Sequence, residues 1–530
     1  SDGRVVPQGR RKPVPTPASE EGGMATTTSK QAVQLELFRE TADSPKGDVA
    51  RPAAGLPATA MSAVPKTPNT TRDARPAMTM EEVADEDNLR EAFRRVASNK
   101  GAPGPDRQTI AHVARHLDRL LPSLRQNLLM EGYLPGQIRR VWIPKAGGGE
   151  RGLGIPNVID RVVQQAVHQV LSPNYEPTFH ASSHGFRPGK SCHTAIAAAR
   201  QHIHDGLVVV VDFDLEKFFD RVHHERLLAR LATRIRDERL IRLVRRMLKA
   251  KVVMPDGVVV SSDEGTPQGG PLSPLLSNIV LDELDRELDR RGHRFVRYAD
   301  DCNIYVRSQR AGERVMHSIS QFIERRLRLT VNRSKSAVAR PGTRHFLGFR
   351  LKPRWDSSGI RDVEVRLSER SQKRIAEKLR ELTPRNWGNS LEACISQVSQ
   401  YIRGWVGFFA IVSATERSTL RDLDGHLRRR LRALILKHWR RKRTIARRLI
   451  KLGARNKRTR GEIFSARSWW AMSRTSATHT ALSVRYFEKR GLVSLEAEWD
   501  RRRPTYVTVQ QLNLGQLVEE PDVRPTSPVL

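Results

Sequence analysis

The fold of this chain is decided by the stretch Arg294-Phe295-Val296-Arg297-Tyr298-Ala299-Asp300-Asp301-Cys302-Asn303-Ile304-Tyr305-Val306. Apolar and β-type residues flank two adjacent carboxylates, which predicts a strand, a tight turn carrying the acids, and a return strand. Adjacent acids repel each other, so a turn that presents both usually lies beside a cation. Asp300 and Asp301 would suit Mg²⁺, which keeps waters and substrate phosphates as its other ligands.

A second group of acids follows four consecutive valines in Val208-Val209-Val210-Val211-Asp212-Phe213-Asp214. The valines predict a buried central strand with carboxylates at its exit. Two such strands side by side could hold two metal ions for in-line phosphoryl transfer, whereas the alternative is a pair of solvated acidic loops. Strand alternation puts Asp212 and Asp214 on one face, and spacing alone does not choose between them. Asp220 is predicted to cap the next helix.

The composition points to a nucleic-acid partner. The chain has 530 residues, room for about three domains, and its net charge is +35 with a pI near 11.0. Such an excess indicates polyanion binding and makes a membrane partner less favoured. A ribosomal-type or histone-like binder is the alternative, but it would not need carboxylates concentrated beside a polyanion.

Cysteine usage and hydropathy predict a cytoplasmic protein. The three cysteines lie far apart at Cys192, Cys302 and Cys394, so they form neither a zinc pair nor a disulfide framework. No apolar run of about 18 residues predicts a membrane span. The histidines show no metal spacing, and His223 and His224 are expected in a turn or facing RNA.

The chain divides by composition into four parts. Residues 1–80, rich in Pro, Ala, Thr and Ser, are expected to be disordered. Residues 81–355 alternate irregularly between strand and helix patterns, which predicts an α+β fold. Residues 356–455 are amphipathic, helical and very basic, and residues 456–530 form a mixed basic region and tail. Helices are expected over 87–96 and through Leu117 to Leu128.

Two loops carry residues suited to a nucleotide. In 141–156, two apolar stretches around glycines predict a hairpin with Lys145 before the turn and Arg151 after it. These cations could clamp a triphosphate, although an exposed glycine-rich turn explains the isolated pattern equally well. In 265–278, a Gly- and Pro-rich loop places Gln268 where the backbone can approach a ligand closely.

In combination and in order, these motifs resemble those of a reverse transcriptase. Their particular residues resemble the motifs of the group II intron-encoded proteins. Further segments similar to the motifs of that family are Ser183–Ser191, Leu329–Lys335, His345–Phe349 and Arg403–Phe409. The resemblance spans roughly residues 85–495 and implies a right-hand polymerase. Its fingers and palm would occupy 81–355, a helical thumb or maturase domain 356–455, and a DNA-binding region with its tail 456–530. No Cys/His cluster follows the Trp-rich region, so the chain resembles the bacterial class C branch, which lacks an H-N-H endonuclease.

The resemblance implies roles for particular residues. The catalytic carboxylates would be Asp214, Asp300 and Asp301, with the carbonyl of Leu215 helping to hold the second of two Mg²⁺ ions. Contacts to the incoming nucleotide are implied for Lys145, Arg151, Phe219, Gln268 and Lys335. Among these, Phe219 would block a ribose 2′-OH and Lys335 would lie near the leaving pyrophosphate. Phe346 to Phe349 would support the primer end.

The basic helical region is expected to contact phosphates, because so many charges of one sign would repel each other on an ordinary surface. Its nucleic-acid-binding candidates are Arg428, Arg429, Arg432, Arg440, Arg441 and Arg443. Trp469 and Trp470 could stack on bases or belong to the core, and the sequence does not separate the two.

The expected function is that of an RNA-directed DNA polymerase that binds its group II intron RNA, assists splicing and copies the intron into DNA during retrohoming. The implied partners are the intron RNA, a DNA target and primer, and dNTPs, without a membrane, at the bacterial nucleoid. Priming would use an existing end such as a nascent replication strand. The alternatives are a splicing factor that has lost polymerisation, which the three intact acids disfavour, and a domesticated enzyme of DNA repair or phage defence. The oligomeric state stays open.

Overall fold

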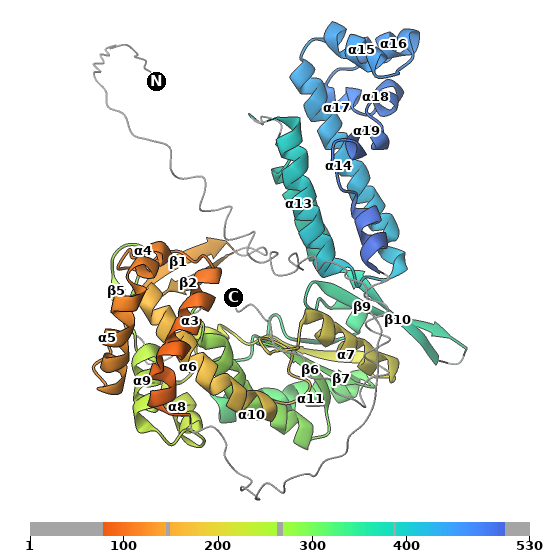
Figure 1. The fold of residues 1–530 in the computed structure, drawn as a ribbon. Coiled ribbons are helices and arrows are strands. Elements are labelled where there is room, and N and C mark those ends of the chain that lie inside the picture. The colour runs from red at the N-terminus through yellow and green to blue at the C-terminus, as the bar shows by residue number, and fades with distance from the viewer. Residues whose placement is uncertain are drawn as a thin grey trace, which may run out of the picture. The chain divides into compact units, whose positions relative to one another are not determined.

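The computed structural model describes residues 78–144, 149–261, 265, 269–357, 359–384, 388 and 390–503 (Figure 1). The expected disorder of residues 1–77 and the tail beyond residue 503 lie outside the described residues. The first helix, α2, begins at Met80, where ordered structure was expected. Among the described residues, no helix combines the length and the apolar character needed to cross a membrane.

The N-terminal helices form because capped, amphipathic segments bury one face. The Asp85 side chain accepts from the Asn88 amide and begins α3, whose buried positions Leu89, Phe93 and Val96 recur at helical spacing. This face packs against α6, which is buried over most of its length. Both helices expected in this region are confirmed. The bounds are α2 (Met80–Ala84), α3 (Glu86–Ser98), α4 (Ile110–Arg115), α5 (Leu117–Leu129) and α6 (Val158–Tyr175).

The expected glycine-rich hairpin is confirmed as β1 (Ile138–Pro144) and β2 (Glu150–Ile155), which pair antiparallel. It belongs to a four-stranded sheet of order β2-β1-β4-β5, in which β1 and β4 run parallel. The other two strands are short, β4 (Val252–Val253) and β5 (Val259–Val260).

A second four-stranded sheet, called the palm sheet here, has the order β6-β7-β3-β8 and only antiparallel pairs. Its central strand β3 buries Val209 and Val211 in one hydrophobic core and Val210 in another, because alternate side chains face opposite sides. Helix α11 packs on β3. Helix α7 packs on β6 (Figure 1). The palm strands are β3 (Val209–Phe213), β6 (Arg294–Tyr298), β7 (Asp301–Val306) and β8 (Ala337–Ala339).

The helices of this region are α7 (Cys192–His204), α8 (His224–Ala232), α9 (Glu238–Leu248), α10 (Ser273–Arg290) and α11 (Gln309–Phe322). Three of them, α7, α10 and α11, pack on the palm sheet, while α8 packs on α9 and α10, and α10 also contacts α6. Helix α10 begins directly after the Gly- and Pro-rich loop, as expected.

The chain then forms a two-stranded hairpin, β9 (Phe349–Asp356) and β10 (Gly359–Leu367), before turning helical. The boundary expected between residues 355 and 356 therefore falls inside a hairpin. Phe349 stacks on Phe408 of α13, so the hairpin and the helical region share a core. The remaining helices are α12 (Glu369–Glu381), α13 (Leu391–Phe409), α14 (Arg417–Trp439), α15 (Lys442–Lys451), α16 (Asn456–Ser465), α17 (Trp469–Met472), α18 (Ser476–Ala481) and α19 (Val484–Glu488). The predicted α+β class is confirmed.

Candidate active site

The strand register brings the separated acids together. Strands β3 and β7 pair Asp212 with Asn303 and Phe213 with Cys302, so Asp214 leaves β3 opposite Asp301. Strands β6 and β7 pair Tyr298 with Asp301, which leaves Ala299 and Asp300 as a two-residue turn. Ala299 occupies the left-handed region at φ 55°, a conformation in which an L-residue needs support.

The electrostatics show that these carboxylates are close neighbours. Burial, together with the negative charges of Asp300, Asp212 and Asp214, raises the pKa of Asp301 to about 7. Burial also raises the pKa of Asp300, while the Arg151 guanidinium acts in the opposite direction. The site is therefore a concentration of negative charge with Arg151 at its edge, which is a setting that favours a cation.

The donor chemistry fits Mg²⁺, because the acids supply only oxygen. Within the described part of the chain, however, no three His, Cys, Asp or Glu side chains are grouped closely enough to hold a metal ion. An ion bound here would need oxygens beyond these carboxyl groups, from the backbone or from substrate phosphates. The expected contribution of the Leu215 carbonyl is of this kind and stays a prediction.

The structure separates the roles of Asp212 and Asp214. Arg344 donates to Asp212 Oδ2 from both Nε and Nη2, at 2.9 and 2.6 Å, so Asp212 is committed to an ion pair. The Asp214 side chain is 33% exposed, and Lys335 Nζ lies 3.5 Å from its Oδ2. Arg344 also donates to the Lys335 carbonyl at 2.7 Å. Asp214, directly after β3, is thus the more accessible of the two acids, and the expected role of Lys335 near a pyrophosphate stays a prediction.

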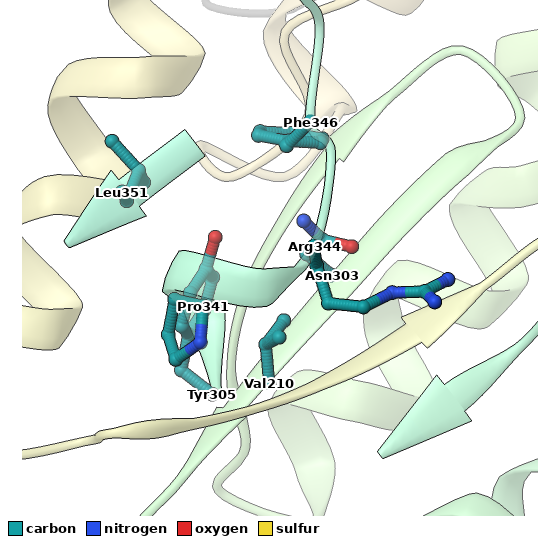
Figure 2. Close-up of a pocket in the computed structure, with 7 residues that line it drawn as sticks. All are labelled: Val210, Asn303, Tyr305, Pro341, Arg344, Phe346 and Leu351. Atoms are coloured by element: carbon teal, nitrogen blue, oxygen red, sulfur yellow. The ribbon is translucent and has the colours of Figure 1, made fainter. Parts of the chain in front are cut away.

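Arg344 also lines a small cavity (Figure 2). The palm sheet lines it with Val210, Asn303 and Tyr305, and the segment leading into β9 lines it with Arg344 and Phe346. It has room for about one water molecule. The cavity is therefore too small to admit a nucleotide.

The expected nucleotide contacts are placed in part. Arg151 lies exposed on β2 across from Ile143. Phe219 lies in the short 3₁₀ helix Phe218–Asp220, half-buried, with its ring 5.3 Å from that of Phe218. Lys145 and Gln268 lie outside the described residues, so nothing in the structure bears on them.

Comparisons with known proteins identify the family. Residues 143–351 match the family described as reverse transcriptase (RNA-dependent DNA polymerase), and residues 372–452 match the group II intron, maturase-specific domain. Protein YkfC of Escherichia coli (strain K12) is 34% identical over 304 residues, which cover 50% of this chain and 80% of YkfC. The chain belongs to the group II intron reverse transcriptase and maturase family.

Two further relatives carry names that fit this family. Group II intron-encoded protein LtrA of Lactococcus lactis subsp. cremoris is 35% identical over 199 residues, covering 37% of this chain and 32% of LtrA. Nuclear intron maturase 2, mitochondrial, of Arabidopsis thaliana is 29% identical over 177 residues, covering 26% of this chain and 24% of that protein. The chain therefore spans a third or less of these two relatives. The predicted reverse transcriptase with a maturase domain is confirmed.

Two expectations about this reverse transcriptase need correction. Asp220 does not cap α8: the cap is His223, whose Nδ1 accepts from the Arg226 amide, because the 3₁₀ helix shifts the helix start. His224 is buried and lies 2.5 Å from the Gly265 carbonyl, so it does not face RNA. The side chains of Phe346 and Phe349 are buried and the two residues form a β-bridge, and their expected support of a primer end stays a prediction.

The basic helices of the maturase domain divide into exposed and buried charges. Arg440, Arg441 and Arg443 are exposed. Arg432 is 5% exposed and donates to the Leu482 carbonyl at 2.9 Å, so we now assign it to packing instead of RNA contact. Arg428 and Arg429 are half-buried.

The two tryptophans of this domain are neither free platforms nor full core. The Arg429 guanidinium lies 3.7 Å from the Trp470 ring centroid, which places Trp470 against α14. Trp469 is 40% exposed. Lys437 Nζ lies 6.0 Å from the Trp469 ring centroid, so each of the two rings has a cation beside it, and stacking on bases stays a prediction.

The sequence analysis did not identify the side chains that support the turn of Ala299 and Asp300, called the acidic turn here. Arg297 is fully buried and contacts Asp285, Asn278, Ser183 and the Ala299 carbonyl. The available signal was an arginine between Val296 and Tyr298 inside the strand, since a buried arginine needs polar partners.

Proposed function

We propose that this protein copies RNA into DNA by joining a primer 3′-OH to the α-phosphate of a dNTP at Asp214, Asp300 and Asp301. The observation that carries the proposal is the register of β3 and β7, which sets Asp214 opposite the acidic turn in a chain of the reverse transcriptase family. Asp300, at the turn itself, is the direct metal ligand of the adjacent pair.

Two Mg²⁺ ions, when bound, would lower the cost of bringing a hydroxyl and a phosphate together. Asp214, Asp300 and Asp301 would hold them, with the Leu215 carbonyl. The residues of the chain would orient the reacting groups and neutralise the charge of the phosphates. Arg151 would bind the triphosphate and Lys335 the leaving pyrophosphate, while Phe219 would exclude a 2′-OH.

The partner of this polymerase is proposed to be its own group II intron RNA. The maturase-specific match and the exposed arginines around α15 support this, as does a net charge of +35. The protein would bind the folded intron, assist splicing and then copy the intron into a DNA target during retrohoming.

The polymerase proposal is tested by primer extension on an RNA template with Mg²⁺. Wild-type protein should make cDNA, and Asp300→Ala should abolish synthesis while RNA binding persists, because the basic helices supply that affinity. Asp205→Ala, an exposed acid at the end of α7, is the matched control and should extend normally. No cDNA from folded wild-type protein would instead favour a splicing factor without polymerase activity.

The maturase proposal is tested separately with RNA alone. The protein should bind its group II intron RNA more tightly than an unrelated RNA of equal length, and it should accelerate splicing at low Mg²⁺. Equal affinity for both RNAs, with polymerisation intact, would favour a domesticated enzyme in repair or phage defence. Intact intron RNA domains around the gene would argue for mobility.

A further inference from the structure

The acidic turn rests on a buried guanidinium that takes no part in the proposed chemistry. The side chains of Arg297 and Asp285 are both 0% exposed and form a two-pronged ion pair, with N–O distances of 2.6 and 2.7 Å. Asp285 lies on α10 and Arg297 on β6, so the pair fixes the palm sheet to that helix.

One prong of this guanidinium reaches the turn itself. Arg297 Nη1 donates to the Ala299 carbonyl at 2.9 Å. That carbonyl belongs to the peptide group whose nitrogen is the amide of Asp300. Arg297 therefore fixes the plane of the Ala299–Asp300 peptide, and with it the direction in which Asp300 leaves the backbone.

The preceding peptide is held from the other side by Gly185. A Cβ at Gly185 would lie 2.2 Å from the Ala299 nitrogen and 3.0 Å from the Tyr298 carbonyl carbon. The segment containing Gly185 also runs beside β6, where the His184 amide donates to the Arg297 carbonyl and the Arg297 amide donates to the Ser182 carbonyl. The Tyr298–Ala299 peptide group is thus supported by Gly185, and the Ala299–Asp300 peptide group by Arg297.

Asn278 joins the two supports. Its Nδ2 donates to the Gly185 carbonyl at 2.9 Å, and its Oδ1 accepts from Arg297 Nη1 at 3.0 Å. Asn278 is 1% exposed and lies in the second turn of α10. Displacement of α10 or of the segment around Gly185 would therefore be transmitted directly to the turn.

We infer that Arg297 is a positioning residue that keeps Ala299 in its left-handed conformation and so holds Asp300 in place for metal binding. The inference rests on the proposed polymerase function. A guanidinium that served only an ion pair would contact Asp285 alone. The Arg297 guanidinium also donates a hydrogen bond to the carbonyl of Ala299, the residue with the strained backbone. Ala299 at φ 55° would leave that region if its carbonyl were released, because only glycine adopts it without cost.

The test uses Arg297→Lys, alone and combined with Ala299→Gly. Lysine keeps a positive charge beside Asp285 but cannot fork to the Ala299 carbonyl as well. Glycine removes the penalty of the left-handed turn, so it should restore part of what the lysine variant loses. The matched control is Arg230→Lys, because Arg230 pairs with Asp282 of the same helix at 3.1 Å without reaching the turn.

Two readouts are needed, so that failure of this inference differs from failure of the polymerase proposal. The first is the affinity for Mn²⁺, measured by electron paramagnetic resonance without nucleic acid, with Asp300→Ala to define background binding. The second is the single-turnover rate of dNTP incorporation. If wild-type protein binds Mn²⁺ through Asp300 but copies no RNA, only the polymerase proposal fails.

We expect Arg297→Lys to weaken Mn²⁺ binding and slow incorporation at least tenfold. Ala299→Gly in that background should recover about fivefold, the factor that corresponds to the ~1 kcal/mol cost of a left-handed L-residue. Arg230→Lys should change neither readout. A folded Arg297→Lys protein with wild-type Mn²⁺ affinity, or a loss that Ala299→Gly does not repair, would overturn the inference.

A second variant covers the case in which Arg297→Lys does not fold. Asn278→Ala leaves the Arg297–Asp285 pair intact and cuts the link to Gly185. It should weaken Mn²⁺ binding about threefold, with recovery by Ala299→Gly. Unchanged affinity in a folded Asn278→Ala protein would count against the inference in the same way.

Discussion

Replacing Gly185 with alanine should disable the active site without touching any acid. The added Cβ would lie 2.2 Å from the Ala299 nitrogen, whereas ordinary contacts of this kind begin at 3.4 Å. Either the turn or the segment around Gly185 must then move by roughly 1 Å, a displacement that can cost about a hundredfold in rate when it misplaces reacting groups. A hundredfold corresponds to ~2.7 kcal/mol of activation free energy.

The assay is single-turnover incorporation of one dNTP at saturating nucleotide, with thermal melting and RNA binding measured on the same protein. Gly342→Ala is the matched control, because its nearest new neighbours would lie 3.7 Å or farther away. Gly185→Ala should slow incorporation about a hundredfold while RNA binding and the Gly342→Ala rate stay near wild type. An incorporation rate for Gly185→Ala within about threefold of wild type would refute the reasoning, since the turn would then tolerate the shift.

Three further outcomes are expected. Phe219→Ala should raise ribonucleotide incorporation, measured by primer extension with rNTPs, and no increase would mean that another residue forms the gate. The pKa of Asp301 is raised to about 7 in the folded protein, so folding favours the protonated carboxyl. Protonated Asp301 therefore contributes to the free energy of unfolding at low pH, and this contribution is lost as pH rises toward 7. Mg²⁺ competes with that proton, so it should raise the melting temperature more at pH 8 than at pH 6, and Asp301→Asn should remove the difference. Arg432→Ala should lower the melting temperature, because the hydrogen bond to the Leu482 carbonyl is lost. Arg441→Ala should leave the melting temperature unchanged but weaken RNA binding, and the slope of log affinity against log salt should fall by about one phosphate contact.

Local patterns predicted the elements that carry the acids. The alternation around Asp300 and Asp301 predicted the β6–β7 hairpin, and the valine run predicted the central strand that ends at Phe213, one residue before Asp214. These predictions hold because a two-residue turn and a strand buried on both faces are specified by residues that are neighbours in the chain.

Predictions about partners were weaker. Asp212 and Asp214 lie on the same face at the end of β3. The ion pair that distinguishes Asp212 is formed with Arg344, which is 132 residues away in the chain. Arg432 stands in a run of arginines that looks uniform in sequence, yet it is buried where Leu482 meets α14. The 3₁₀ helix at Phe218–Asp220 displaced the cap of α8 from Asp220 to His223.

By itself, the sequence determined the family, the strands and helices, and the acids from which a polymerase site could be built, because motif order and hydrophobic periodicity are properties of the chain. Only the tertiary structure decided which acid of β3 is free, which arginine supports the turn and which basic side chains remain at the surface. Each of those outcomes depends on burial and on partners far along the chain, and a charged side chain carries no local mark of what will surround it once the sheets and helices have packed.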